Sequence, residues 1–213
     1  MMKNIVVLVS GSGSNLQAFI DACGNKIPNA RISAVISNKS DAYGLQRALS
    51  AGINIHSLSA AGYENREQYD SALATLIDLH KPDVIILAGF MRILSEDFVL
   101  RYQGKMLNIH PSLLPKYTGL HTHQRAINAR DKEHGTSVHF VTPELDGGPV
   151  ILQAKVPIFE DDNAEEVASR VQAQEHVIYP MVANWLVEGR LLMKEGKAVL
   201  DGEALGLSGL ETE

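Results

Sequence analysis

The chain has 213 residues, of which 45% are hydrophobic and 21% are charged, a composition typical of a soluble globular protein with one sizeable core. The formal net charge of −6 argues against nucleic acid or an anionic membrane as a partner. The single cysteine, Cys23, excludes an internal disulfide. Neither an apolar run of about 18 residues nor a leader-like pattern is apparent, so we expect a cytoplasmic protein. It could be a monomer or a homodimer.

The first half of the chain alternates strand-like and helix-like segments. Apolar, β-branched runs predict buried strands, and apolar residues at helical spacing between them predict helices. One helix should span Asp41–Ala51, with Asp41 as its N-cap. Another helix should end near His80. We expect the side chains of His56 and His80 to lie in solvent at the ends of their elements. Short connections predict a parallel sheet with right-handed crossovers, whose expected strands are Ile5–Val9, Arg31–Ser37, Ile53–Leu58 and Asp83–Gly89.

A glycine-rich loop, S-G-S-G-S-N at residues 10–15, follows the first strand and opens a helix. A strand, a glycine turn and a helix N-terminus together offer free backbone N–H groups and the positive end of a helix to an anion. No Gly-Lys-Ser/Thr follows, which excludes a Walker loop, and Leu16 stands where a dinucleotide fingerprint needs its third glycine. A single phosphate on a small molecule fits best, and a tight turn that merely needs glycine is the alternative.

A second loop, residues 88–94, leaves the carboxyl end of the fourth strand and is unusually apolar. It either lines a crevice for a flat ligand or folds back onto the core. Ser95 should then cap a short helix. The next strand, Met106–Ile109, cannot continue past the prolines Pro111 and Pro115.

The second half of the chain predicts a short helix at His121–Ala129 and strands at Gly135–Val141 and Val150–Ile158. Asn163 and Glu166 form a capping box that opens a long helix, which Pro180 should end or kink. A hairpin over residues 191–205 and a frayed tail should follow. We therefore expect an α/β fold: a Rossmann-like, mostly parallel sheet with helices on both faces, to which the C-terminal part adds antiparallel strands and a long helix.

The strand before Pro111 carries the most distinctive polar residues. Side chains alternate along a strand, so Asn108 and His110 point to the same side. An amide and a protonated imidazole can both donate hydrogen bonds to one oxygen, as an acyl-transfer transition state requires. Two polar residues that cap a turn are the alternative. His121 and His123 lack a third ligand at suitable spacing, so we expect no metal site.

Three motifs together resemble the folate-dependent formyltransferases: N-I-H-P-S-L-L-P-K-Y-T-G from residue 108, H-G-T-S-V-H from residue 134, and L-D-G-G-P-V-I from residue 145. The resemblance runs from Ile5 to about Gly189. It implies transfer of the formyl group of 10-formyltetrahydrofolate, as co-substrate and without a metal, to the amine of 5-phosphoribosylglycinamide in purine synthesis. The chain departs from the family pattern at Ser12, where some members have Asn, and at Thr118, where Pro is usual.

The resemblance also implies roles for particular residues. Asn108 and His110 would stabilise a tetrahedral intermediate, and Asp146, in the glycine-rich turn, would keep His110 charged and relay a proton. The ribonucleotide would be bound by Gly13, Ser14, Asn15, Gln172 and Glu175. Folate would be bound by Arg66, Met91, Arg92, Ile93, Leu94, Asn108, Thr142, Pro143, Glu144, Leu145 and Asp146.

We expect one domain over residues 1–213, with a phosphate-binding half at about 1–110, a folate-binding half at about 111–190 and a C-terminal hairpin and tail at 191–213. Three alternatives to the ribonucleotide enzyme stay open. A formyltetrahydrofolate hydrolase or a methionyl-tRNA formyltransferase would share the Asn, His and Asp arrangement. A phosphosugar-binding module without turnover would have the same residues.

Overall fold

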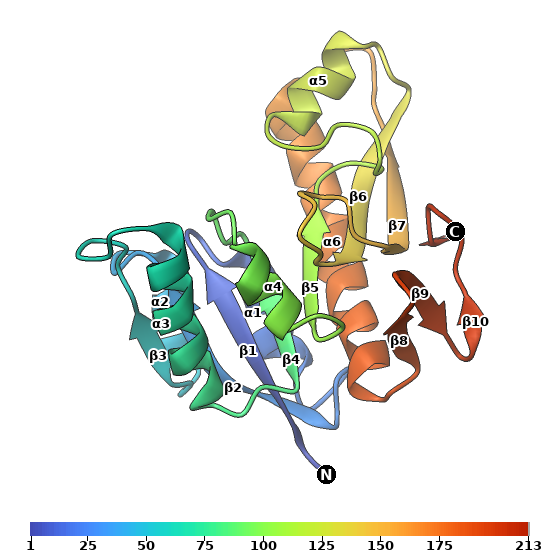
Figure 1. The fold of residues 1–213 in the computed structure, drawn as a ribbon. Coiled ribbons are helices and arrows are strands. Elements are labelled where there is room, and N and C mark those ends of the chain that lie inside the picture. The colour runs from blue at the N-terminus through green and yellow to red at the C-terminus, as the bar shows by residue number, and fades with distance from the viewer. Residues whose placement is uncertain (213) are drawn as a thin grey trace.

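A mixed eight-stranded sheet runs through the molecule, which the computed structural model describes over residues 1–212 (Figure 1). The order across the sheet is β11-β7-β6-β5-β4-β1-β2-β3. Neighbours from β3 to β5 pair in parallel, β6 is antiparallel to both β5 and β7, and β11 pairs in parallel with β7. The strands are β1 (Lys3–Val9), β2 (Ala30–Ser37), β3 (Ile55–Ser57), β4 (Val84–Leu87), β5 (Met106–His110), β6 (Glu133–Phe140), β7 (Val150–Pro157) and β11 (Leu210–Glu211). The expected fold class is confirmed.

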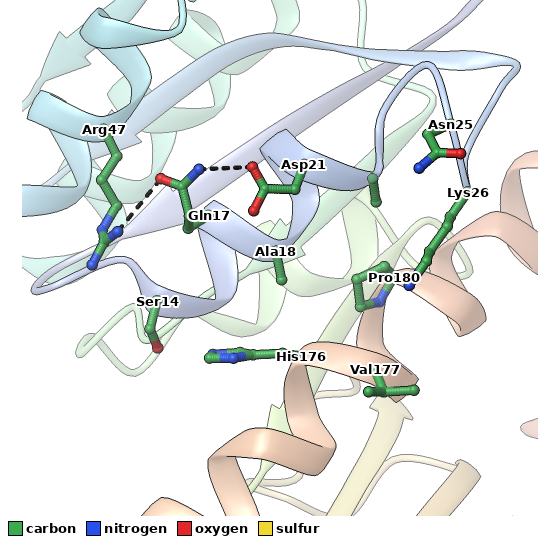
Figure 2. Close-up of a pocket in the computed structure, with 11 residues that line it drawn as sticks. Ser14, Gln17, Ala18, Asp21, Asn25, Lys26, Arg47, His176, Val177 and Pro180 are labelled. Carbon is green, nitrogen blue, oxygen red and sulfur yellow. Dashed lines mark hydrogen bonds between the residues drawn. The ribbon is translucent and has the colours of Figure 1, made fainter.

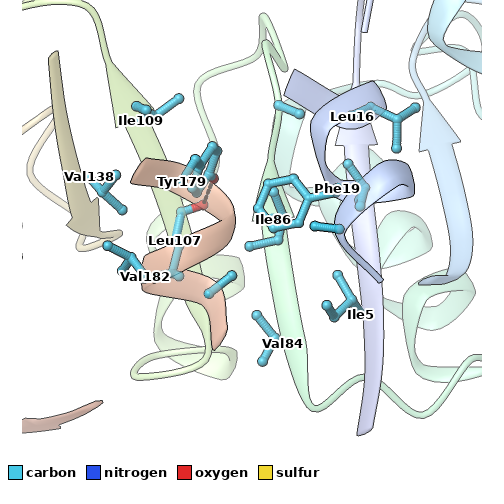
Figure 3. Packing of buried hydrophobic residues seen from close by; sticks show 14 of the residues in the cluster. Ile5, Leu16, Phe19, Val84, Ile86, Leu107, Ile109, Val138, Tyr179 and Val182 are labelled. Atoms are coloured by element: carbon cyan, nitrogen blue, oxygen red, sulfur yellow. Dashed lines mark hydrogen bonds between the residues drawn. The ribbon is translucent and has the colours of Figure 1, made fainter. Parts of the chain in front are cut away.

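Helices cover both faces of the sheet because the central strands carry apolar side chains on both faces. Val6 and Leu8 of β1 face α3 (Arg66–Asp78) and α4 (Glu96–Arg101). Ile5 and Val7 face the other layer, which holds α1 (Ser14–Ala22), α2 (Tyr43–Ser50) and α6 (Ala164–Val187) (Figure 3). A short helix, α5 (Thr122–Asn128), packs against α6. No helix within residues 1–212 is long and apolar enough to cross a membrane.

Tyr179 of α6 joins this layer to the middle of the sheet. Its ring is fully buried and packs edge-on against Phe19, with ring centroids 5.0 Å apart. Its hydroxyl lies 2.8 Å from the carbonyl oxygen of Leu87 and 2.9 Å from that of Leu107, on β4 and β5. A buried hydroxyl needs such partners. The contact fixes α6 against the two strands that end at the candidate site.

One prediction about helix ends is wrong, and of the two outcomes predicted for Pro180 the structure excludes the first. Asp41 does not cap α2: the N-cap is Ala42, and no side chain bonds there, because Asp41 lies one residue too early. Pro180 does not end the long helix, which continues to Val187. Proline removes one N–H donor, and the burial of residues on both sides of it in the core, Tyr179 and Val182 among them, holds the helix together. The capping box of Asn163 and Glu166 is confirmed, as is the Ser95 cap of α4.

The C-terminal part is more ordered than the sequence predicts. β8 (Leu191–Lys194), β9 (Lys197–Leu200) and β10 (Glu203–Ala204) form a separate antiparallel sheet. The expected frayed tail instead contributes β11, whose Leu210 pairs with Leu152. Gly209 makes this approach possible, because a Cβ there would lie 2.5 Å from the Ile151 carbonyl oxygen.

Four histidines form two pairs that the sequence does not indicate. The Nε2 atoms of His56 and His80 lie 2.8 Å apart, so these rings bond to each other rather than standing alone in solvent. Nδ1 of His123 lies 3.1 Å from Nε2 of His134. In each pair one nitrogen must donate and the other accept, which requires at least one neutral ring.

His134 should make the protein less stable in acid. Its side chain is buried, and burial together with His123 lowers its pKa to about 4. The unfolded chain, in which the ring titrates near about 6.5, therefore binds more protons, and stability falls as the pH drops from about 6.5 to 4. The full effect is on the order of 3 kcal/mol. Urea unfolding at pH 7.5 and 4.5 should show a smaller difference for His134→Gln than for the wild type. The exposed His121→Gln serves as control, and equal pH dependence in all three proteins would contradict the assignment.

Candidate functional site

A cavity of about 400 Å³ opens at the carboxyl ends of β4 and β5, and we call it the strand-end cavity. Its walls are residues 90–94 after β4, Asn108 and His110 of β5, and residues 142–146 between β6 and β7. The structure thus brings together every residue expected for folate except Arg66, which begins α3 and lies outside the cavity lining. Ligands bind α/β sheets at this edge because the loops that follow the strands meet there.

Large apolar side chains surround the strand-end cavity and stay accessible. Met91, Ile93, Leu120 and Leu145 are each between 59% and 66% exposed. The loop after β4 is held open by Ser10, whose hydroxyl accepts a hydrogen bond from the Met91 N–H at 2.8 Å. Phe90 and Leu94 of this loop pack against the core, whereas Met91 and Ile93 stay exposed at the cavity. An exposed apolar rim around a few polar groups is typical of a site for a flat organic ligand.

His110 lies between two hydrogen-bond acceptors. Its Nε2 is 2.7 Å from the carbonyl oxygen of Tyr117, and its Nδ1 is 3.5 Å from Oδ2 of Asp146. The side chains of His110 and Asp146 are each 8% exposed. A carbonyl and a carboxylate can only accept, so a ring protonated on both nitrogens satisfies both neighbours, whereas a neutral ring would turn a lone pair to one of them. The arrangement favours an imidazolium paired with a carboxylate.

The loop between β5 and α5 holds both members of this pair. The Gly119 N–H donates to Oδ2 of Asp146 at 2.9 Å, while the Tyr117 carbonyl accepts from His110. Nη1 of Arg125 bonds the Thr118 carbonyl oxygen at 2.6 Å, which secures the position where the sequence departs from the family pattern. Tyr117 adopts a left-handed conformation, with φ of 52°. The backbone of this loop therefore fixes the relative placement of imidazole and carboxylate.

Asn108 is oriented by His139, the last residue of the H-G-T-S-V-H motif, to which the sequence assigns no role. His139 stands opposite Asn108 in the β5–β6 ladder, and its Nδ1 lies 2.9 Å from the Phe140 carbonyl oxygen. Burial lowers the pKa of His139, so the ring is neutral with its proton on Nδ1. Its Nε2 then accepts from Nδ2 of Asn108 at 3.4 Å. This contact leaves one amide N–H of Asn108, which lines the cavity, free for a ligand.

Asp146 occupies a constrained backbone position. Its φ of 52° is unusual for a residue other than glycine, and such strain concentrates at functional sites. The turn also needs Gly148, because a Cβ there would lie 1.8 Å from the Phe140 carbonyl oxygen. The carboxylate is thus placed by the turn itself.

The glycine-rich loop lies beside α6, as the ribonucleotide assignment requires. Nε2 of Gln172 donates to the Ser14 hydroxyl at 2.7 Å, and Nδ2 of Asn15 lies 3.4 Å from Oε2 of Glu175. Gly13, with φ of 73°, is the N-cap of α1, which has no side-chain cap and no acidic residue in its first turn. Its N-terminus can therefore accept an anion.

Glu175 has an unusual electrostatic environment. Burial raises its pKa to about 7, and the hydrogen bond from the Asn15 side chain only partly offsets this. A carboxyl group that is part protonated at neutrality can both donate to and accept from a sugar hydroxyl. No group of three or more His, Cys, Asp or Glu side chains in the described part of the chain is placed to hold a metal ion.

The sequence matches known proteins over most of its length. Residues 3–183 match the family model described as formyl transferase. The chain is 60% identical to phosphoribosylglycinamide formyltransferase of Escherichia coli (strain K12) over 95% of each protein. It is 53% identical to the Haemophilus influenzae enzyme of the same name over the full length of both. The solved structure of phosphoribosylglycinamide formyltransferase from Coxiella burnetii covers all of both chains with a TM-score of 0.96 at 48% identity.

The turn that carries Asp146 should tolerate a methyl group at one glycine and not at the next. Gly148→Ala forces a Cβ against a backbone carbonyl and should lower the free energy of unfolding by about 2 kcal/mol or more. Gly147→Ala meets only the flexible Glu144 side chain, which can move, so its effect should be below about 1 kcal/mol. Denaturant unfolding of both variants measures the difference. Equal losses would show that the Phe140 carbonyl does not constrain this turn.

Proposed function

This chain belongs to the formyl transferase family, and from that premise we propose that it transfers the formyl group of 10-formyltetrahydrofolate to the amine of 5-phosphoribosylglycinamide. The observation that carries the proposal is the convergence of Asn108, His110 and Asp146 in one cavity with an apolar rim. The names of the two bacterial relatives support the same substrate. The reaction would be a step of purine synthesis.

The two substrates enter from two sides of β5. The phosphate of the ribonucleotide binds the N–H groups of Gly13, Ser14 and Asn15, with Gln172 beside them and Glu175 on the ribose hydroxyls. The folate lies in the strand-end cavity, where residues 91–94 and 142–146 supply an apolar wall and backbone polar groups. A role for Arg66 in folate binding stays a prediction, as does the division into halves near residue 110.

The nucleophile is the amine of the substrate itself, so no serine or cysteine of the enzyme is needed. The amine attacks the formyl carbon, and the formyl oxygen becomes an oxyanion. Asn108 and His110 donate hydrogen bonds to that oxygen. Each well-placed donor lowers the activation free energy by on the order of 3 kcal/mol. The Tyr117 carbonyl occupies Nε2 of His110, so the donor to the formyl oxygen would be Nδ1–H. At 3.5 Å its contact with Oδ2 of Asp146 is an ion pair rather than a hydrogen bond, which leaves this N–H available.

The proton of the attacking amine must reach the leaving nitrogen of the folate. Asp146 accepts it and returns it, directly or through one water, as the bond between the formyl carbon and that nitrogen breaks. The products are the formylated amide and tetrahydrofolate, so atoms and charge balance. The carboxylate also stabilises the imidazolium throughout.

The proposal is tested by incubation with 10-formyltetrahydrofolate, with and without 5-phosphoribosylglycinamide, while tetrahydrofolate and formylated ribonucleotide are followed. We expect both products, in equal amounts, only when the amine substrate is present. Tetrahydrofolate without the amine would indicate a hydrolase. Binding of the ribonucleotide without product would indicate a phosphosugar-binding module, and formylation of methionyl-tRNA instead would indicate the tRNA enzyme.

Asp146→Asn should separate chemistry from binding. The amide keeps the shape of the carboxyl group and loses its charge and basicity, so kcat should fall by about 10²- to 10⁴-fold while KM for both substrates changes little. Asp97→Asn, on the exposed face of α4, is the charge-matched control and should retain kcat within about twofold. Steady-state kinetics of the two variants decide the matter. A kcat for Asp146→Asn near that of the wild type would exclude proton transfer through this residue.

A further inference from the structure

Arg47 of α2 contacts the glycine-rich loop through a backbone carbonyl, next to the residues assigned to the phosphate. Its Nε donates to the Ser12 carbonyl oxygen at 2.7 Å. From this contact we infer that Arg47 is a positioning residue, which sets the affinity for the substrate's phosphate by holding the loop peptides in the orientation that phosphate needs. The inference rests on the proposed function and adds a residue to it.

Peptide geometry carries the argument. A trans peptide is planar, with its carbonyl and N–H pointing in opposite directions. The peptide from Ser12 to Gly13 is trans, since the cis bond of this chain is Leu114–Pro115. Because Arg47 holds the Ser12 carbonyl, the N–H of Gly13 points to the opposite side of the loop. One residue earlier, the N–H of Gly44 holds the Gly11 carbonyl at 3.0 Å and turns the N–H of Ser12 in the same manner.

The N–H groups that α2 orients in this way are available to a ligand. None of the hydrogen bonds among residues 1–212 uses the N–H of Ser12 or Gly13 as donor. Both directly precede the uncapped N-terminus of α1. Successive N–H groups that converge at a helix N-terminus form an anion-binding concavity. The two bonds from α2 therefore determine which face of the loop is electropositive.

Close packing leaves the loop little freedom to adopt another orientation. A Cβ at Gly13 would lie 2.7 Å from the Cα of Gly44 and 3.4 Å from the Cδ of Arg47. The guanidinium is itself held, because it lies over the Tyr43 ring, 4.9 Å from the centroid, and its Nη1 is 3.4 Å from Oε1 of Gln17 (Figure 2). Arg47 is thus a fixed donor rather than a mobile surface charge.

Arg47 also carries a positive charge near the loop, and two substitutions separate charge from orientation. Arg47→Met removes both. Arg47→Lys keeps the charge but puts a methylene group where Nε now donates. Arg31→Met, on the exposed end of β2, removes one charge elsewhere and is the control.

Direct binding of ribose 5-phosphate, measured by calorimetry, tests the inference without turnover. We expect Arg47→Met to weaken binding by about tenfold or more and Arg47→Lys by about fivefold, while Arg31→Met stays within about twofold. Wild-type affinity in Arg47→Met would overturn the inference. Wild-type affinity in Arg47→Lys would also overturn it, because charge alone would then be sufficient.

Kinetics give a readout that general damage to the fold would not reproduce. For each protein, kcat/KM is compared between 5-phosphoribosylglycinamide and the same riboside without its phosphate. We expect the advantage of the phosphorylated substrate to shrink by about tenfold in Arg47→Met, with the unphosphorylated substrate, the folate KM and kcat unchanged. An equal loss with both substrates would overturn the inference. If the wild type shows no formyl transfer while the calorimetric difference persists, the proposed function fails and the role of Arg47 stands.

Discussion

The ring of His110 lies between two groups that can only accept hydrogen bonds, and the rest of the site depends on this constraint. The Tyr117 carbonyl on one side and the Asp146 carboxylate on the other favour a ring that carries both protons. The loop after Pro115 and the turn at Gly148 therefore fix both neighbours of this ring.

The fold brings these groups together because its central strands end at one edge. β5 presents Asn108 and His110 from the same side of the strand, and β6, which runs antiparallel to it, places His139 opposite the amide. Tyr179 fixes α6 to β4 and β5, and the same helix carries Gln172 and Glu175 to the glycine-rich loop. The glycine-rich loop and the strand-end cavity are therefore connected through α6 and the central strands.

The sequence predicts helices and strands well where the hydrophobic periodicity is strong. It also predicts which candidate site residues lie together where they stand on one strand, because side chains alternate along it. Asn108 and His110 could be assigned to one side of β5 because only the strand period is needed. His139 could not be found, since its role depends on the register between β5 and β6. Arg47 was missed for a similar reason: its partner is a backbone carbonyl on another element, which has no signature in the sequence. The end of the long helix could not be predicted from Pro180, because the burial of its neighbours in the core outweighs the local penalty for proline in a helix.

The pairing of β11 with β7 has a consequence for synthesis on the ribosome. β7 emerges before α6 and before the small sheet of β8, β9 and β10, whereas its outer neighbour β11 emerges after all of them. Throughout that interval the outer edge of β7 exposes unpaired backbone groups, a template to which a strand of another nascent chain can add. The pairing of Leu210 and Glu211 with Leu152 and Gln153 therefore protects this part of the edge from such an addition.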